Sequence, residues 1–138
     1  MSSQSREARV QKIKEEKAQN KQLAPFALLA FFRLAEEWQL SVAEQVILLG
    51  HPSRSTFYNW RSEKIAGVPH DTLSRLSHLM AIHRALGVLF SDPEQAYAWV
   101  TGPNAQLGGQ TPLDRMLAGD LVDLAVIRTY LDGMVQAA

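Results

Sequence analysis

Apolar side chains recur along most of this chain at steps of three and four residues, which places them on one side of an α-helix. The spacing is clearest after Asp71, which is expected to cap a helix of about five turns. The expected apolar side of that helix consists of Leu73, Leu76, Leu79, Met80, His83 and Leu86. The cap-and-proline pair Thr111-Pro112 starts a further helix, and a final helix follows from Asp120 after Gly119. No segment shows sustained strand alternation, so the pattern predicts an all-α protein.

The front of the chain changes character at Pro25. Residues 5–22 are polar and rich in good helix formers, with only a weak apolar side, which predicts an exposed helical arm. Such an arm either contacts phosphates or a partner subunit, or is a solvated extension. After Pro25 the large apolar side chains are too many for a narrow stripe, which predicts a helix that is mostly core. These side chains are Phe26, Leu29, Ala30, Phe32 and Leu34.

Two short helices joined by a tight turn are expected next. Ser41 and Glu44 have the spacing of a capping box, in which each side chain accepts from the other residue's backbone amide. Gly50 is placed to end that helix. Ser53 can cap the following one. A helix, a glycine-containing turn and a second helix with a polar exposed face form the helix-turn-helix pattern.

The second of these helices carries the candidate DNA contacts. A helix in the major groove needs hydrogen-bonding side chains on its exposed face and firm packing on the other, and Phe57 and Trp60 are spaced to anchor it. Arg54 suits a phosphate or guanine, and Asn59 suits adenine. The full candidate set is Ser53, Arg54, Ser55, Thr56, Tyr58, Asn59 and Arg61. The alternative is a plain helical hairpin with a solvated face.

The formal net charge of zero conceals an asymmetry. Residues 1–70 hold ten basic and seven acidic residues, a net charge of +3. Residues 71–138 hold four basic and seven acidic residues, a net charge of −3. The front half therefore suits a polyanion and the back half suits a protein partner.

Several kinds of chemistry are not expected. The chain has no cysteine, which excludes disulfides and thiolate sites. No segment approaches the ~20 apolar residues of a membrane span, so we expect a cytoplasmic protein without a membrane role. His78 and His83 lie five apart, on different sides of a helix, which does not favour a metal site. No acid, base and nucleophile form a catalytic set, so we expect neither an enzyme nor a cofactor.

The segment GPNAQLGGQT, residues 102–111, superficially resembles a phosphate-binding loop. Its glycines are spaced one residue too far apart, Gln110 replaces the required lysine, and the preceding segment is helical in pattern instead of extended. We therefore interpret residues 97–113 as a structural corner between two helices. Tyr97 and Trp99 are available there for packing or a partner, and Asn104 is expected to hold the turn through its side chain.

Two stretches resemble one family of proteins. SRSTFYNW is similar to the start of the recognition helix in Xre-type helix-turn-helix proteins, and FSDPEQAYAWVTGPNAQLGGQTPLDRMLAGD resembles the toxin-binding domain of the Xre/MbcA/ParS antitoxins. The shared features of the second are an aromatic pair on a helix, an asparagine loop, a Gly-Gly pair and Thr-Pro-Leu. The resemblance implies a basic helical arm (1–24), an Xre-like helix-turn-helix domain (25–68) and a small helical toxin-binding domain (69–138).

The resemblance also implies a function. Such a protein would bind and sterically neutralise a RES-domain toxin that degrades NAD, or an ADP-ribosyltransferase-like toxin, and would repress its own operon by binding promoter DNA as a homodimer within a larger complex. The residues implied to contact the toxin are Arg128, Tyr130, Asp132, Met134, Val135 and Gln136. The alternatives are a stand-alone helix-turn-helix regulator with a C-terminal dimerisation or interaction domain, and an adaptor without a DNA role.

Overall fold

Helices account for all the regular structure of residues 3–138, which a computed structural model describes. Residues 1 and 2 of the expected arm lie outside the described part. The prediction of an all-α fold is confirmed. In chain order the helices are α1 (Ser3–Glu37), α2 (Val42–Leu48), α3 (Arg54–Arg61), α4 (His70–Leu89), α5 (Pro93–Thr101), the 3₁₀ helix η1 (Ala105–Leu107), α6 (Pro112–Met116) and α7 (Leu121–Ala137).

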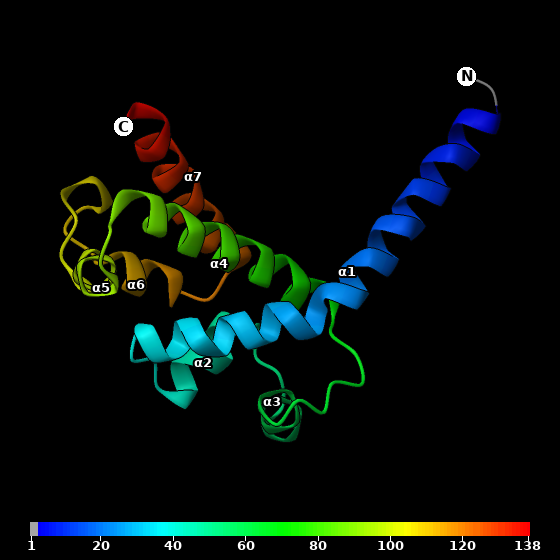
Figure 1. Ribbon diagram of the computed structural model, residues 1–138, viewed down its shortest axis with the longest axis horizontal. Helices are drawn as coiled ribbons and strands as arrows, with labels where there is room; N and C mark the ends of the chain where they lie inside the picture. The colour runs from blue at the N-terminus through cyan, green and yellow to red at the C-terminus, as the bar shows by residue number, and fades with distance from the viewer. Residues whose placement is uncertain (1–2) are drawn as a thin grey trace.

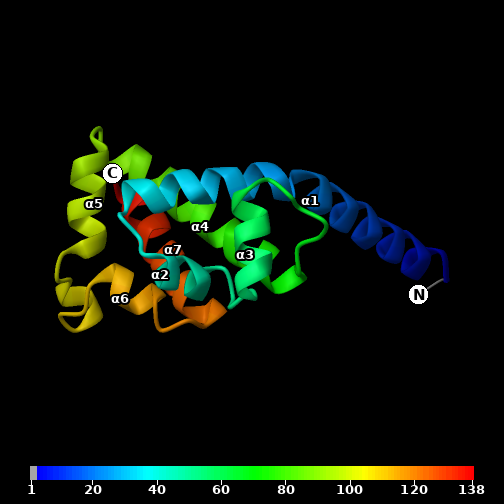
Figure 2. The same cartoon turned by 90° about the horizontal axis from the view of Figure 1, so that it is seen from below.

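The long helix α4 organises the body of the molecule. It packs against the inner half of α1 and against α7, and α5 and α6 close the end of the bundle near the C-terminal part of α4 (Figure 1). The α2–α3 pair lies beside the inner half of α1 (Figure 2), and α3 packs against that helix. One continuous core results, in which Phe31 of α1, Leu79 of α4 and Ile127 of α7 are fully buried. No helix in residues 3–138 is long and apolar enough to cross a membrane.

The arm and the first core helix form a single helix, α1, with Pro25 inside it. Its outer half projects away from the body, and the helix changes direction where the two halves meet (Figures 1 and 2). A proline inside a helix lacks an amide donor and crowds the preceding turn, which accounts for the bend. Every side chain described between residues 5 and 22 is exposed, so the prediction of an exposed helical arm is confirmed.

The prediction that the segment after Pro25 is mostly core was partly wrong. Leu34 is buried, but Phe26 is 70% exposed and Leu29 is 41% exposed. Only one side of α1 meets the body, and these two residues lie on the opposite side. The buried side of the helix consists of Ala24, Leu28, Phe31, Leu34, Ala35 and Trp38.

The capping residues predicted at the starts of α2, α3 and α6 are confirmed. The amide of Glu44 donates to Ser41 Oγ over 3.1 Å, and the amide of Ser41 donates to Glu44 Oε1 over 2.8 Å, which completes the capping box. The side chains of Ser53 and Thr111 cap α3 and α6 by accepting from the amides of Thr56 and Asp114, without the reciprocal bond. These bonds satisfy amides that the first helical turn leaves unpaired.

Two predictions about α4 were wrong. The helix begins at His70 with Pro69 at the cap position, and Asp71 pairs with Arg75 instead of capping. His83 is exposed and pairs with Glu37 of α1, with Nε2 and Oε2 2.8 Å apart. Leu76, Leu79 and Leu86 of the predicted apolar side are buried as expected. Ile82 and Ala85 are buried as well, because α4 is covered from two sides, by α1 and α7.

Candidate functional site

The exposed face of α3 carries polar side chains above an aromatic anchor. Phe57 is fully buried and Trp60 is 3% exposed, which confirms that both point inward. Phe57 also meets Phe32 of α1 edge to face, with ring centres 5.8 Å apart. Of the seven candidate DNA contacts, Thr56 is half-buried and the other six are exposed. The structure thus brings these six side chains onto the outer surface around α3.

Some of these polar groups are already engaged within α3. Ser53 Oγ accepts from the amide of Thr56 over 3.2 Å and donates to Thr56 Oγ1 over 2.9 Å. The guanidinium carbon of Arg54 lies 5.8 Å from the ring centre of Tyr58, within the range of a cation–π contact. A cation–π contact does not use the N–H donors of Arg54, and the Asn59 side chain can both donate and accept. These two residues are therefore best placed to form hydrogen bonds with another molecule.

The turn between α2 and α3 is fixed to the start of α4. Thr72 Oγ1 donates to the carbonyl of Leu49 over 2.8 Å, and both groups are buried. Gly50 has a φ of +90°, and a Cβ atom there would lie 2.6 Å from Asp71 Oδ2. The glycine therefore permits both the left-handed turn and the close approach of α4. The prediction that Gly50 ends α2 is confirmed, but its contact with α4 was not foreseen.

Arg75 links this turn to the other end of the molecule. Its Nε donates to Asp71 Oδ2 and its Nη1 donates to the carbonyl of Gly119, both over 2.8 Å. Gly119 lies in the turn between α6 and α7 and has a φ of +98°. One arginine, 8% exposed, therefore joins the segment next to the helix-turn-helix pair to the segment that starts α7. The sequence offers no signal for this contact, because its two residues are 44 positions apart.

The start of α7 is held by a second buried charge. Asp123 is 7% exposed, and its Oδ1 accepts from Arg115 Nε over 2.9 Å. Its Oδ2 accepts from the amide of Asp120 over 3.0 Å. Both carboxylate oxygens are thus satisfied, as a buried charge requires. The expected start of the helix at Asp120 is confirmed, and Asp123 was missed as the residue that fixes it.

The residues implied to contact a toxin lie along α7 but do not share one face. Tyr130 stacks on Trp99 of α5, with ring centres 6.0 Å apart and planes 19° apart. Met134 and Val135 are half-buried against the core. Asp132 and Gln136 are exposed. The set therefore divides into side chains that attach α7 to the body and side chains that face outward.

Arg128 belongs to the outward group and reaches back to α4. Its Nη1 lies 3.3 Å from His78 Nδ1, and its Nε lies 3.9 Å from Asp132 Oδ2. Burial lowers the pKa of His78 below its usual 6.5, and the neighbouring positive charge of Arg128 lowers it further. Both effects disfavour the imidazolium, so His78 presents a neutral ring to Arg128.

The corner before α6 is tied by Asn104, as expected. Asn104 Oδ1 accepts from the amide of Gln106 over 2.9 Å, and its carbonyl accepts from the amide of Gly109 over the same distance. The loop contains the short helix η1, and both Gly108 and Gly109 have positive φ. The two glycines thus allow the loop to turn back and form hydrogen bonds with its own backbone. No group of three histidine or acidic residues able to hold a metal ion occurs within residues 3–138.

The amino-acid sequence of this chain is similar to known sequences. A family model of the antitoxin Xre/MbcA/ParS C-terminal toxin-binding domain matches residues 85–135. An uncharacterized protein, y4oB, of Sinorhizobium fredii (strain NBRC 101917 / NGR234) is 47% identical over 109 residues, which cover 78% of this chain and 83% of that protein.

The chain belongs to the Xre/MbcA/ParS antitoxin family. In this antitoxin the matched segment runs from the last turns of α4 nearly to the end of α7. It includes the Asp123–Arg115 pair and the Trp99–Tyr130 stack. Gln136 falls one residue beyond the match.

Proposed function

We propose that this antitoxin neutralises a RES-domain toxin that degrades NAD by covering the entrance to the toxin's active site with the C-terminal half of α7. The toxin-binding domain match over residues 85–135 carries this proposal. The position of α7 supports it, because its first turns are fixed in the core while its last turns reach the surface (Figure 1). An ADP-ribosyltransferase-like toxin is the other partner class.

The six candidate residues divide into two roles under this proposal. Arg128, Asp132 and Gln136 contact the toxin directly, since they supply donors and acceptors on the outward side of α7. Tyr130, Met134 and Val135 hold the helix at the angle that presents those three. A steric inhibitor needs such rigidity, because ordering a mobile helix on binding would reduce the affinity.

The antitoxin is further proposed to repress its own operon through α3. Its polar exposed face and aromatic anchor support major-groove binding, with Arg54 and Asn59 in contact with bases. Residues 25–70 hold four basic and four acidic residues, so one protomer offers little net attraction to phosphates. A homodimer would place two α3 helices on half-sites related by its two-fold axis and double the contact.

Co-expression tests the antitoxin proposal. The product of the neighbouring gene is expressed alone and then together with this protein, and growth and cellular NAD are measured. The product should deplete NAD alone and be harmless in the pair. If the product is harmless alone, or remains toxic beside this protein, the proposal fails and a stand-alone regulator with a C-terminal interaction domain becomes the better account.

A footprint on the upstream promoter tests the DNA role separately. Arg54→Ala combined with Asn59→Ala should abolish protection, because it removes the base contacts and leaves the anchor intact. The matched control is Arg84→Ala with Gln106→Ala, which removes one guanidinium and one amide from exposed positions far along the chain from α3. Protection that survives the first pair would remove α3 as the recognition helix and would favour an adaptor without a DNA role.

A further inference from the structure

The helix α1 continues into the arm, where the body of the same chain does not cover it. Ala24, Phe31 and Trp38 are buried and lie seven residues apart. Steps of seven return to nearly the same side of a helix. Carried outward, they lead from Ala24 through Lys17 to Val10, and from Ala27 through Asn20 to Ile13. The side chains of Val10 and Ile13 are each 50% exposed. The arm therefore carries a short, uncovered apolar stripe, Val10 and Ile13, which polar residues separate from the buried side of α1.

The arm is long enough to need support. Residues 3–22 span about 30 Å at 1.5 Å per residue, and Figures 1 and 2 both show this part of α1 leaving the body. In proteins most helical stability comes from the packing of an amphipathic face and not from intrinsic propensity. Packing of this stripe against another surface would stabilise the arm. The body of the same chain does not supply that surface, because it lies at the other end of the helix.

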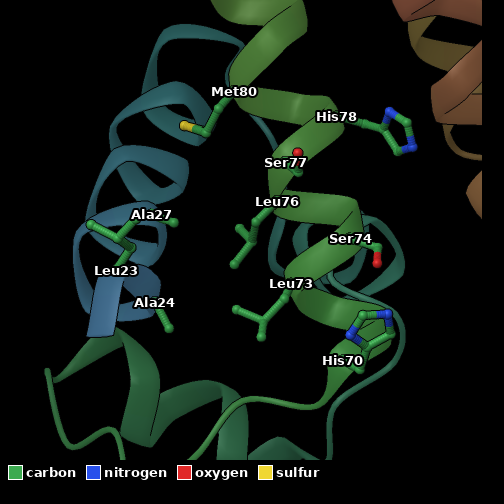
Figure 3. A pocket seen from close by; sticks show the side chains of 10 residues that line it. All are labelled: Leu23, Ala24, Ala27, His70, Leu73, Ser74, Leu76, Ser77, His78 and Met80. Carbon is green, nitrogen blue, oxygen red and sulfur yellow. The ribbon is translucent and has the colours of Figure 1, made fainter. Parts of the chain in front are cut away.

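A groove opens where α4 stops covering α1. It has a volume of about 390 Å³ and lies between the inner start of α1 and the first turns of α4. Leu23 and Ala27 approach it from α1, and Leu73, Leu76 and Met80 approach it from α4, while His78 points away (Figure 3). Leu23 is 57% exposed. The groove therefore offers apolar walls of the kind that a helix with a narrow apolar stripe requires.

Charge favours a second copy of this chain as the occupant. Residues 1–24 hold six basic and three acidic residues, a net charge of +3. Residues 25–138 hold eight basic and eleven acidic residues, a net charge of −3. Opposite net charges steer an arm towards the body of another copy. DNA would attract the same basic residues, but phosphate contacts leave the apolar stripe uncovered.

We propose that the arm of each protomer packs through Val10 and Ile13 into the α1–α4 groove of a second copy, so that two protomers exchange arms about a two-fold axis. Each copy then gives one arm and receives one, which makes the interface self-complementary. The inference rests on the dimer in the proposed function and is independent of the toxin.

Cross-linking tests the location of the arm. The chain has no cysteine, so Ile13→Cys protein can be mixed with Leu73→Cys protein and treated with a short bis-maleimide. The mixture should give a product of twice the chain mass that joins the two variants. Gln11→Cys, on the opposite side of the arm, should give much less product with Leu73→Cys. A Ile13→Cys sample that cross-links equally well to itself would show arm-to-arm pairing and overturn the proposal.

The association constant tests the stripe without chemical modification. Val10→Asp with Ile13→Asp should weaken the dimer at least tenfold in analytical ultracentrifugation, and the matched control Ala8→Asp with Gln11→Asp should leave it unchanged. Circular dichroism verifies that the body remains folded in both. A stripe variant that dimerises normally overturns the proposal. If such a variant dimerises normally but loses affinity for the promoter, the arm is assigned to DNA binding instead. Toxin neutralisation is scored separately, so its failure is distinguishable from both results.

Discussion

α7 and the outer half of α1 are both long helices, but the rest of the chain supports them very differently. Leu124, Ile127 and Leu131 of α7 are fully buried. Val10 and Ile13 of the arm are the apolar residues of an otherwise polar segment, and each is half exposed. Burial of a large apolar side chain contributes about 1.5–3 kcal/mol, so α7 is held by its own chain. The arm has little of this support from its own chain.

The difference separates two kinds of substitution. A change on the inner side of α7 should reduce the stability of the single chain, and its effect on a toxin would follow from that loss. A change in the arm should leave the single chain stable and alter only its assembly. Measurements of unfolding at low protein concentration distinguish the two.

The largest effect is expected from Leu131→Ala. The side chain is fully buried, so its truncation loses apolar burial and leaves a cavity, at a cost of about 2–5 kcal/mol. Urea unfolding followed by circular dichroism measures this cost. Thr129→Ala, at an exposed position of the same helix, is the control. A cost below about 1 kcal/mol would mean that α7 is loosely attached, and the contrast with the arm would disappear.

Asp123→Asn should cost less, about 1.5–3 kcal/mol, the range for a hydrogen bond to a charged group. The shape is kept, but Arg115 loses its ionic partner and one oxygen becomes an amide donor. The same unfolding measurement applies, with Asp132→Asn on the exposed side of α7 as the control. Equal effects of the two substitutions would show that the buried pair does not hold the start of α7.

A smaller effect should come from His78, which packs beside Arg128. Its pKa is lowered in the folded state, first by burial and then by Arg128. As the pH falls below 6.5, His78 is therefore protonated in the unfolded chain before it is protonated in the folded chain. The free energy of unfolding decreases over this range until the pH reaches the lowered pKa. Above pH 6.5 the ring is neutral in both states and contributes no slope.

Unfolding of the His78→Gln variant checks this pH dependence. Measured between about pH 7.5 and 5.5, it should lose less stability on acidification than the parent protein. Arg128→Gln should remove only part of the slope, because burial is the larger cause. A parent slope that His78→Gln leaves unchanged would show that this contact between α4 and α7 does not affect stability.

Ile13→Ala should have the smallest effect on the single chain. The residue is half exposed on an unsupported helix, so the free energy of unfolding at monomer concentrations should change by less than about 0.5 kcal/mol. At concentrations where the protein dimerises the same substitution should lower the melting temperature. A large effect on the monomer would mean that the arm folds back on its own chain.

The sequence was most informative where a local pattern determines a local structure. Ser41 with Glu44, and Ser53 before Phe57 and Trp60, predicted α2 and α3 with the correct side of α3 inward. Capping depends on residues within one turn, and the direction of a side chain depends on helical spacing. Both can be deduced without knowledge of any distant part of the chain.

The sequence was less informative where the burial of a side chain depends on which other helix packs against it. Phe26 and Leu29 are as apolar as Phe31, yet they are exposed because α3 and α4 cover only the other side of α1. His83 fitted the spacing of the α4 stripe but faces solvent and Glu37. The apolar pattern gives a set of candidate faces, and only packing selects one of them.

The amino-acid sequence by itself determined an all-helical chain, the capping of its short helices, the charge difference between its halves and the family resemblance of residues 90–120. All of these follow from neighbours within a few positions or from counts of residues. The tertiary structure alone decided that Arg75 joins Asp71 to Gly119, that Asp123 fixes α7, and that α1 runs on into an uncovered arm. The Arg75–Gly119 contact joins residues 44 positions apart, and the Arg115–Asp123 pair joins two different helices. Both therefore depend on how whole helices pack together.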